Sequence, residues 1–285
     1  MRGLVLEGGG ARGAYHIGVI KALVEKGYTF DGFVGTSIGA VNAASMAQGD
    51  FTKAAQLWEN ISSDQIFDEE EMDIIQLADL GNLWKNINFS PSTRRAASKV
   101  IRGRGLNTKK MRIFLETYID EEKIRRSGKD FGLVTVSIPD LVAHQLMMED
   151  IPRGSLINYI MASASLPGFQ REIINKKKYV DGGFFDNMPF NLLINKGYDE
   201  IIAIRTGSLG RIHPMKKEHN IKSITPREYL GNSVIFNKDR IKTNINMALQ
   251  QSGKFEINWK TQTWTVELMR TMAISEVSEA RFESS

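Results

Sequence analysis

The chain opens with short apolar runs that each end in a glycine-rich turn. Residues 3–7 (GLVLE) lead into GGGARG, and residues 30–35 (FDGFVG) lead into GTSIG. Apolar residues with helical spacing follow the first turn as far as Gly27, and an Ala/Ser/Gly-rich helical segment follows the second as far as Gly49. Because strand, glycine turn and helix recur in this order, the pattern predicts a parallel sheet with crossover helices.

The same alternation resumes further along the chain. We expect buried strands at residues 131–137, 144–150 and 200–206, and a helix around SLINYIMAS. QREII and KKYVDGG flank a turn and predict a hairpin. NMPFNLLINKG predicts a short helix, with Pro189 near its first turn and Gly197 at its end.

Two regions depart from this alternation. Residues 51–129 are charged and mainly helical in pattern, which predicts a helical insertion or cap within a domain that spans residues 1–207. Residues 208–285 are polar, basic and poorly patterned, so we expect them to form a lid or a tail.

Composition narrows the class of protein. The chain has 285 residues, of which 42% are hydrophobic and 25% charged, as in ordinary folded domains. It contains no cysteine, which excludes disulfides, thiol nucleophiles and cysteine-based metal centres. No apolar run approaches the ~18 residues that span a bilayer, and the N-terminus lacks the pattern of a signal peptide. The expected location is therefore the cytoplasm.

The net charge is +4, and the charged residues are distributed unevenly along the chain. Ten basic residues against four acidic ones lie between residues 210 and 260; the basic residues are Arg211, Lys216, Lys217, Lys222, Arg227, Lys238, Arg240, Lys242, Lys254 and Lys260. A basic face attracts anionic lipid headgroups or nucleic acid, although such segments are more often solvated helical surfaces. We expect no nucleic acid partner, and we keep peripheral contact with an anionic membrane as a hypothesis.

The second glycine turn, GTSIG, matches the G-x-S-x-G nucleophile pattern and lies between a strand and a helix. Such a turn projects the Ser37 hydroxyl above the sheet edge, and Gly35 and Gly39 allow the sharp bend. A serine needs a base to accept its proton. The four histidines have no evident acidic partner, and we expect each to be structural or on the surface.

Asp181 is a candidate base of another kind. It ends a predicted strand in YVDGGFFDNMP and is followed by two glycines, Asn187 and Pro189. Asp-Gly-Gly is also a common turn sequence. A carboxylate hydrogen-bonded to the Ser37 hydroxyl could act without an imidazole if burial raised its pKa above ~3.9.

The motifs GGGARG, GTSIG, ASASLPG and YVDGG…NMP, in this order, resemble the patatin-like phospholipase family. The resemblance covers residues 1–207, includes Pro167, and implies a three-layer α/β/α fold with a mostly parallel central sheet and helices on both faces. It implies an enzyme that cleaves acyl esters of phospholipids, lysophospholipids or related lipids, with Ser37 as the nucleophile and Asp181 as its base. It places the oxyanion hole in the backbone of the glycine loop: Gly8, Gly9, Gly10, Ala11, Arg12 and Gly13. No cofactor and no metal are expected for this chemistry.

Three alternatives remain at this point. Gly8, Gly10 and Gly13 also fit the dinucleotide pattern G-x-G-x-x-G, with Asp31 as the acid on the ribose. A scaffold protein could keep the fold without the reaction. The same fold could also pass the acyl group to an alcohol, as an acyltransferase does. The sequence leaves the oligomeric state and the position of the cleaved ester undetermined.

Two side-chain roles are also open. Arg12 either adds positive charge beside the oxyanion or a phosphate, or braces the loop. Phe169, Phe184, Phe185, Met188 and the QLMM stretch are candidates for an apolar entrance, although each is more typical of core.

Overall fold

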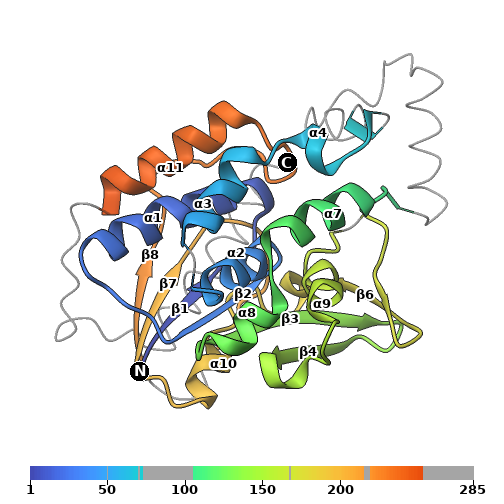
Figure 1. The fold of residues 1–285 in the computed structure, drawn as a ribbon, viewed down its shortest axis with the longest axis horizontal. Coiled ribbons are helices and arrows are strands. Elements are labelled where there is room, and N and C mark those ends of the chain that lie inside the picture. Colours follow the sequence, from blue (N-terminus) through green and yellow to red (C-terminus); the bar gives the residue numbers. More distant parts are fainter. Residues whose placement is uncertain (50, 70, 73–104, 167, 215–218, 253–285) are drawn as a thin grey trace, which may run out of the picture.

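The computed structural model describes residues 1–49, 51–69, 71–72, 105–166, 168–214 and 219–252. Within these residues eight strands form one sheet in the order β5-β6-β3-β2-β1-β7-β8, and β4 also pairs with β3 (Figure 1). Pro167, which is part of the family resemblance, lies outside the described residues. Helices cover both faces of the sheet, so the predicted three-layer α/β/α architecture is confirmed.

The parallel part of the sheet contains four strands that the apolar runs predict and, last along the chain, one strand that they do not predict. These strands are β1 (Arg2–Leu6), β2 (Gly32–Thr36), β3 (Asp130–Ile138), β7 (Glu200–Ile204) and β8 (Asn220–Ile224). Leu4 of β1 is in register with Phe33 on one side and Ile202 on the other. The carboxyl ends of β1, β2 and β7 therefore meet at one edge of the sheet, where the glycine turns begin.

The remaining strands run antiparallel. They are β4 (Val142–Met147), β5 (Ile173–Ile174) and β6 (Lys177–Asp181). β5 and β6 form the predicted hairpin, and β6 pairs with β3 so that Asp181 is opposite Thr135. The strand expected at 144–150 begins and ends earlier, and residues Met148–Asp150 form a short 3₁₀ turn.

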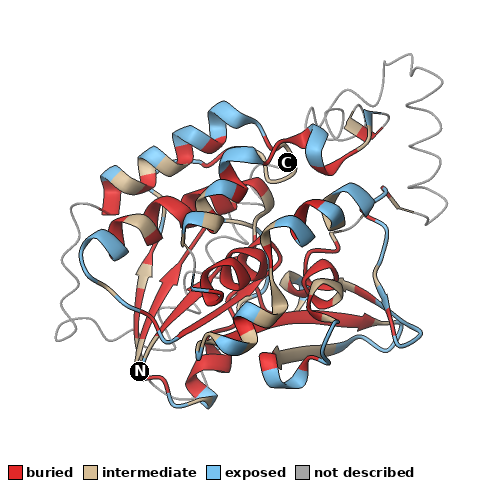
Figure 2. Cartoon of the chain, viewed as in Figure 1, coloured by how far each residue is buried: buried red, intermediate tan, exposed pale blue. Residues whose placement is uncertain are grey.

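The helices of the first half are α1 (Ala14–Glu25), α2 (Ile38–Ala47), α3 (Phe51–Asn60), α4 (Ser63–Ile66), α7 (Lys109–Tyr118) and α8 (Glu121–Arg126). Those of the second half are α9 (Leu156–Ser163), α10 (Phe190–Asn195) and α11 (Lys238–Ser252). Short 3₁₀ helices occupy Gly10–Gly13 and Gly182–Phe184. Every residue of α2 is buried against the sheet, as its small residues predict (Figure 2). The described parts of residues 51–129 are mainly helical, and their role as an insertion or cap stays a prediction.

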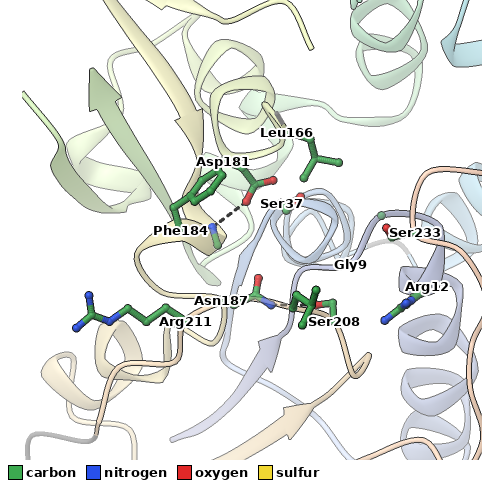
Figure 3. Close-up of a pocket in the computed structure, with 14 residues that line it drawn as sticks. Gly9, Arg12, Ser37, Leu166, Asp181, Phe184, Asn187, Ser208, Arg211 and Ser233 are labelled. Carbon is green, nitrogen blue, oxygen red and sulfur yellow. Dashed lines mark hydrogen bonds between the residues drawn. The ribbon is translucent and has the colours of Figure 1, made fainter. Parts of the chain in front are cut away.

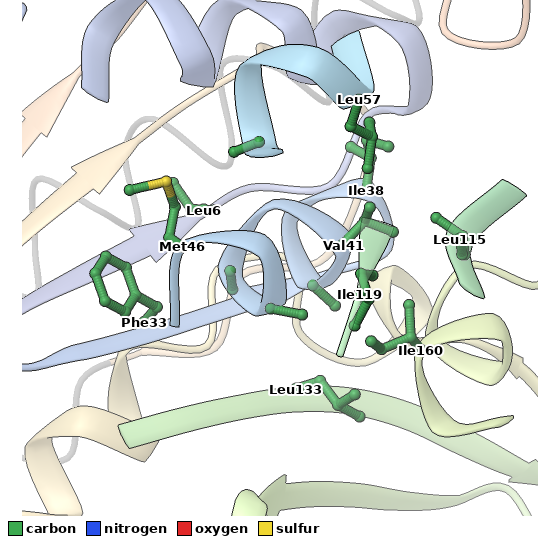
Figure 4. Close-up of a cluster of buried hydrophobic side chains, with 14 of the residues drawn as sticks. Leu6, Phe33, Ile38, Val41, Met46, Leu57, Leu115, Ile119, Leu133 and Ile160 are labelled. Carbon is green, nitrogen blue, oxygen red and sulfur yellow. The ribbon is translucent and has the colours of Figure 1, made fainter. Parts of the chain in front are cut away.

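Alternate residues of the parallel strands point to opposite faces of the sheet and build two cores. Leu6, Phe33 and Leu133 face the larger core, which α2 and its neighbouring helices complete (Figure 4). Val5 and Val34 face the smaller core, which is covered by α10. Both faces of the sheet are therefore covered by apolar side chains. Polar groups reach the surface of the sheet at the carboxyl ends of the parallel strands.

The sheet continues beyond residue 207, in the region that the sequence pattern leaves without a defined structure. β8 pairs with β7 in parallel, with Ile224 opposite Ile204. α11 packs along α1 (Figure 1). The Tyr15 hydroxyl and the Gln251 side chain form a buried hydrogen bond of 2.9 Å between these two helices. This part of the chain therefore contributes an edge strand and a covering helix.

Candidate active site

Ser37 occupies the bend between β2 and α2. Its backbone has φ 57° and ψ −126°, a strained conformation for a residue with a side chain. A Cβ at Gly35 would overlap the backbone of Gly39, so the two flanking glycines allow the strand and the helix to approach each other closely. The Ser37 N–H donates to Oγ of Ser163 at 2.9 Å. The bend is a sharp strand-to-helix turn, the context that the G-x-S-x-G pattern requires, and the role of Ser37 as a nucleophile stays a prediction.

Asp181 lies at the end of β6 with only 4% of its surface exposed. Its Oδ1 accepts a hydrogen bond from the Gly183 N–H at 2.7 Å, whereas Oδ2 has no hydrogen-bond partner among the described residues. Its carboxyl group lies beside Ser37 (Figure 3). Burial raises the pKa of Asp181 to about 6, and the Gly183 N–H and the Ser37 hydroxyl oppose that rise. The carboxylate is therefore more basic than an exposed aspartate but still ionised at neutral pH.

The glycine loop divides into N–H groups that have partners and N–H groups that do not. Gly8 donates to the Asn187 carbonyl at 3.4 Å, Ala11 to the Ser233 carbonyl at 2.8 Å, and Arg12 to the Gly9 carbonyl at 3.1 Å. The N–H groups of Gly9 and Gly10 have no acceptor among the described residues, and both glycines line the pocket with Ser37.

Two further features complete the loop. Gly10 has φ 53°, and a Cβ there would overlap the Ser233 carbonyl, so this position requires glycine. Gly13 ends the 3₁₀ helix and is buried; it does not line the pocket. Of the six residues predicted for an oxyanion hole, Gly9 and Gly10 are therefore the ones with free donors at the pocket.

Arg12 braces the loop. Its Nε donates to the Gly231 carbonyl at 2.8 Å and its Nη1 to the Gly207 carbonyl at 2.6 Å. The guanidinium also lies over the ring of Tyr229, 5.0 Å from its centre. Of the two predicted roles, these contacts favour the bracing one, because the donors of the guanidinium are directed at backbone carbonyls.

A pocket of about 420 Å³ contains Ser37 and Asp181 and opens to solvent past apolar side chains. Phe184 and Leu209 line it and are 59% and 87% exposed, and Leu166 also lines it. Phe184 and Leu166 lie on different sides of Ser37 and Asp181 (Figure 3). Phe184 therefore belongs to the entrance and not to the core. The other candidates differ: Phe169, Met147, Met148 and Met188 are buried, and Phe185 packs against the smaller core.

Several residues of the site are not predicted as such by the sequence. Asn187, Ser208 and Arg211 all line the pocket. Asn187 belongs to the NMP motif, which was a usable signal. Ser208 and Arg211 lie in the stretch after β7, where the sequence carries no recognisable pattern. The guanidinium of Arg211 has no hydrogen bond or ion pair within the described residues, unlike that of Arg12.

All four histidines lie in the described part of the chain, and none of them lines this pocket. His16 is fully buried, and its Nδ1 lies 3.1 Å from Nδ2 of Asn42. Burial lowers the pKa of His16 to about 3. His144 and His213 are partly buried in contact with aromatic rings, Tyr179 and Phe185 respectively. The arrangement thus presents Asp181, and no imidazole, to Ser37.

The fold does not support dinucleotide binding, because Asp31 lies far from the glycine loop. Asp31 precedes β2, whereas the glycine loop follows β1, and the two strands are parallel. Asp31 accepts a hydrogen bond from the Arg2 N–H at 2.9 Å, at the amino edge of the sheet. The sheet therefore separates this carboxylate from any ligand held by the loop.

The basic segment is distributed over several elements. Lys238, Arg240 and Lys242 are exposed along α11, and Lys222 is buried on β8. Four of the ten cations (Lys216, Lys217, Lys254 and Lys260) lie outside the described residues. In the part of the chain that the structure describes, no helix combines the length and the hydropathy needed to cross a membrane.

Comparisons with known proteins show which family the chain resembles. Residues 4–194 match the family model described as patatin-like phospholipase. The chain is 28% identical over 213 residues to the lysophospholipase NTE1 of Mycosarcoma maydis, and 31% identical over 222 residues to the neuropathy target esterase sws of Drosophila melanogaster. These matches cover 74% and 72% of this chain but only 10% and 13% of those proteins. The crystal structure of VipD from Legionella pneumophila aligns with a TM-score of 0.49 and 16% identity, over 88% of this chain and 66% of that one.

Proposed function

The chain belongs to the patatin-like phospholipase family, and from this premise we propose that it hydrolyses acyl esters of lipids through a Ser37–Asp181 dyad. The observation that carries the proposal is the pocket itself. It brings the serine of a strained turn, a buried carboxylate and the free N–H groups of Gly9 and Gly10 to one place. The lysophospholipase and esterase names of the relatives support the same class of reaction.

The first half of the proposed reaction acylates the serine. Oγ of Ser37 attacks the ester carbonyl carbon while Oδ2 of Asp181 accepts the hydroxyl proton. The carbonyl oxygen becomes an oxyanion, to which the N–H groups of Gly9 and Gly10 donate. When the intermediate collapses, the carbon–oxygen bond to the alcohol breaks and Asp181 returns the proton to the leaving alkoxide.

The second half releases the acid. Water attacks the acyl-serine while Asp181 again accepts a proton, and the same N–H groups stabilise the second oxyanion. Collapse breaks the bond to Oγ of Ser37, which takes the proton back from Asp181. Because Asp181 is ionised at neutral pH and has an unpaired Oδ2, it can serve as the base in both halves.

Phospholipids or lysophospholipids are the proposed substrates. Phe184, Leu209 and Leu166 give the pocket apolar lining that an acyl chain can contact. Arg211 also lines the pocket, and its guanidinium, which has no partner within the described residues, extends away from Ser37, where it could pair with the phosphate of a bound lipid (Figure 3). Contact with anionic membranes from the cytoplasmic side is part of this proposal.

The deciding experiment compares wild type with Ser37→Ala on p-nitrophenyl butyrate and on a panel of phospholipids and lysophospholipids. We expect wild type to release fatty acid and the variant to lose at least about 10³-fold in kcat, because the nucleophile is gone. Circular dichroism checks that the variant is folded. Equal hydrolysis by the two proteins would rule out the dyad.

A further inference from the structure

Next to the pocket lies a group of hydrogen bonds in which neither Ser37 nor Asp181 takes part. The Gly8 carbonyl accepts two hydroxyl hydrogen bonds, from Oγ1 of Thr206 at 2.5 Å and from Oγ of Ser208 at 2.7 Å. A backbone carbonyl normally receives its hydrogen bonds from a strand or helix neighbour. Here two side chains from the loop after β7 provide both.

This pair of contacts sets the direction of the next N–H group. In a trans peptide the carbonyl of one residue and the N–H of the next lie in one plane and point in opposite directions. With the Gly8 carbonyl held toward Thr206 and Ser208, the Gly9 N–H points to the other side of the loop. Ser37 lies on that side: a Cβ at Gly8 would be 3.3 Å from Cβ of Ser37, and Gly9 is drawn between Ser208 and Ser37 (Figure 3).

Both hydroxyls are themselves held in place. Nδ2 of Asn187 donates to Oγ of Ser208 at 3.0 Å, which leaves the Ser208 hydrogen directed at Gly8. The buried carboxylate of Glu7 accepts hydrogen bonds from the N–H groups of Thr206 at 2.5 Å and Gly207 at 3.1 Å. Glu7 also pairs with the buried guanidinium of Arg205 at 3.2 Å. The support is therefore continuous from the end of β7 to the loop after β1.

We propose that Thr206 and Ser208 are positioning residues, whose hydroxyls turn the Gly8–Gly9 peptide so that the Gly9 N–H faces the oxyanion formed at Ser37. Asn187 assists by fixing the Ser208 hydroxyl, which gives this residue of the NMP motif a role. The inference rests on the proposed function, because an oxyanion forms only if Ser37 attacks an ester. Residues 205–208 would then set the direction of an N–H group in the oxyanion hole.

The test uses Ser208→Ala, Thr206→Val and the double variant in the full chain, with p-nitrophenyl butyrate as substrate. We expect kcat to fall about tenfold in each single variant and about 100-fold in the double variant, with KM within about twofold of wild type. The loss should not exceed the 10²–10³-fold typical of deleting an oxyanion donor, because the N–H remains but is no longer held. Ser208→Thr keeps a hydroxyl and should restore most of kcat.

Two readouts separate positioning from a general loss of structure. A trifluoromethyl ketone forms a tetrahedral oxyanion on serine, so its inhibition constant should rise by the same factor as kcat falls. Ser45→Ala is the matched control, because the buried Ser45 hydroxyl also donates to a backbone carbonyl, that of Val41 at 3.0 Å, and Ser45 does not line the pocket. We expect this control to leave kcat and the inhibition constant within about twofold of wild type.

Each negative result has a distinct meaning. A folded double variant with kcat within about twofold of wild type overturns the positioning role, as does a fall in kcat with no change in the inhibition constant. If Ser37→Ala abolishes hydrolysis while the double variant is fully active, only this inference fails. If Ser37→Ala hydrolyses the ester like wild type, the proposed function fails with it.

Discussion

The chemistry of the site depends on how the fold places single residues. Oδ2 of Asp181 and the N–H groups of Gly9 and Gly10 are ordinary hydrogen-bonding groups, yet none of them has a hydrogen-bond partner within the described residues. The sequence identifies the glycine loop but does not show which of its donors remain free. The Ala11 N–H donates to the carbonyl of Ser233, which is more than two hundred residues away along the chain and comes near only when the chain folds.

At this scale we predict that kcat/KM increases with pH up to about pH 6 and is level above it. The pKa of Asp181 is about 6, and the group must be ionised to accept the Ser37 proton. Below this pH the rate should fall about tenfold per pH unit. The measurement is a pH–rate profile with p-nitrophenyl butyrate between about pH 4.5 and 8. A rate that is constant down to pH 4.5 would contradict the assignment.

Asp181→Asn is the matched variant, and it should lose hydrolysis while gaining stability. The folded pKa of about 6 exceeds the ~3.9 of an unfolded aspartate, so the stability that Asp181 contributes is full below about pH 4 and is lost as the pH rises through about 6. At neutral pH the neutral amide should therefore raise the free energy of unfolding by about 1–3 kcal/mol. Urea denaturation at pH 7.5 and pH 4 should show this gain at the higher pH only.

Among elements, α1 and α11 show how close packing reverses an intrinsic preference. Gly18 lies within α1, where alanine would normally stabilise the helix by up to about 1 kcal/mol. In this fold a Cβ at Gly18 would overlap the Ile245 carbonyl and lie 2.6 Å from Cβ of Ala248, both on α11. The helix pair is therefore held together at a glycine contact.

We predict that Gly18→Ala destabilises the protein by about 1–3 kcal/mol, because the new methyl group must push α11 away from α1. Val24→Ala on the same helix is the control, since Val24 is 44% exposed and should change stability by less than about 0.5 kcal/mol. Urea denaturation followed by circular dichroism measures both. A Gly18→Ala protein as stable as wild type would show that α11 does not pack here.

For the whole molecule, the proposed contact with a membrane can be assigned to particular surface residues. The exposed cations Lys238, Arg240 and Lys242 lie along α11, and apolar Leu209 and Phe184 project at the pocket. Surface cations are common on any protein. The effect of removing these three on membrane binding therefore has to be compared with the effect of removing three cations from another surface. Electrostatic attachment would also weaken as salt screens the attraction.

We predict that the protein sediments with vesicles containing phosphatidylglycerol and much less with pure phosphatidylcholine, and that raising salt from about 50 to 500 mM releases it. Replacing Lys238, Arg240 and Lys242 with glutamine should lower this binding several-fold. The charge-matched control replaces three exposed cations of α7 and α8, namely Lys109, Lys123 and Arg126. Binding that resists salt, or that falls equally in both variants, would contradict a contact through α11.

The sequence by itself determined the strand–turn–helix units, the mostly parallel sheet and the identity of Ser37 and Asp181 as candidates. It could do so because the periods of strands and helices, and the demands of tight turns, depend on near neighbours. β8 and α11 escaped prediction because their buried faces include polar residues, Lys222 in the strand and Asn244 in the helix, which weaken the apolar pattern.

The tertiary structure alone decided which distant groups meet. It brought Asp181 beside Ser37, directed Arg12 to backbone carbonyls, and placed the Thr206 and Ser208 hydroxyls against Gly8. These contacts join the ends of β1, β2, β6 and β7, which are far apart along the chain and end at the same edge of the sheet. No local pattern encodes them, because they arise from the order of the strands and from the packing of both cores.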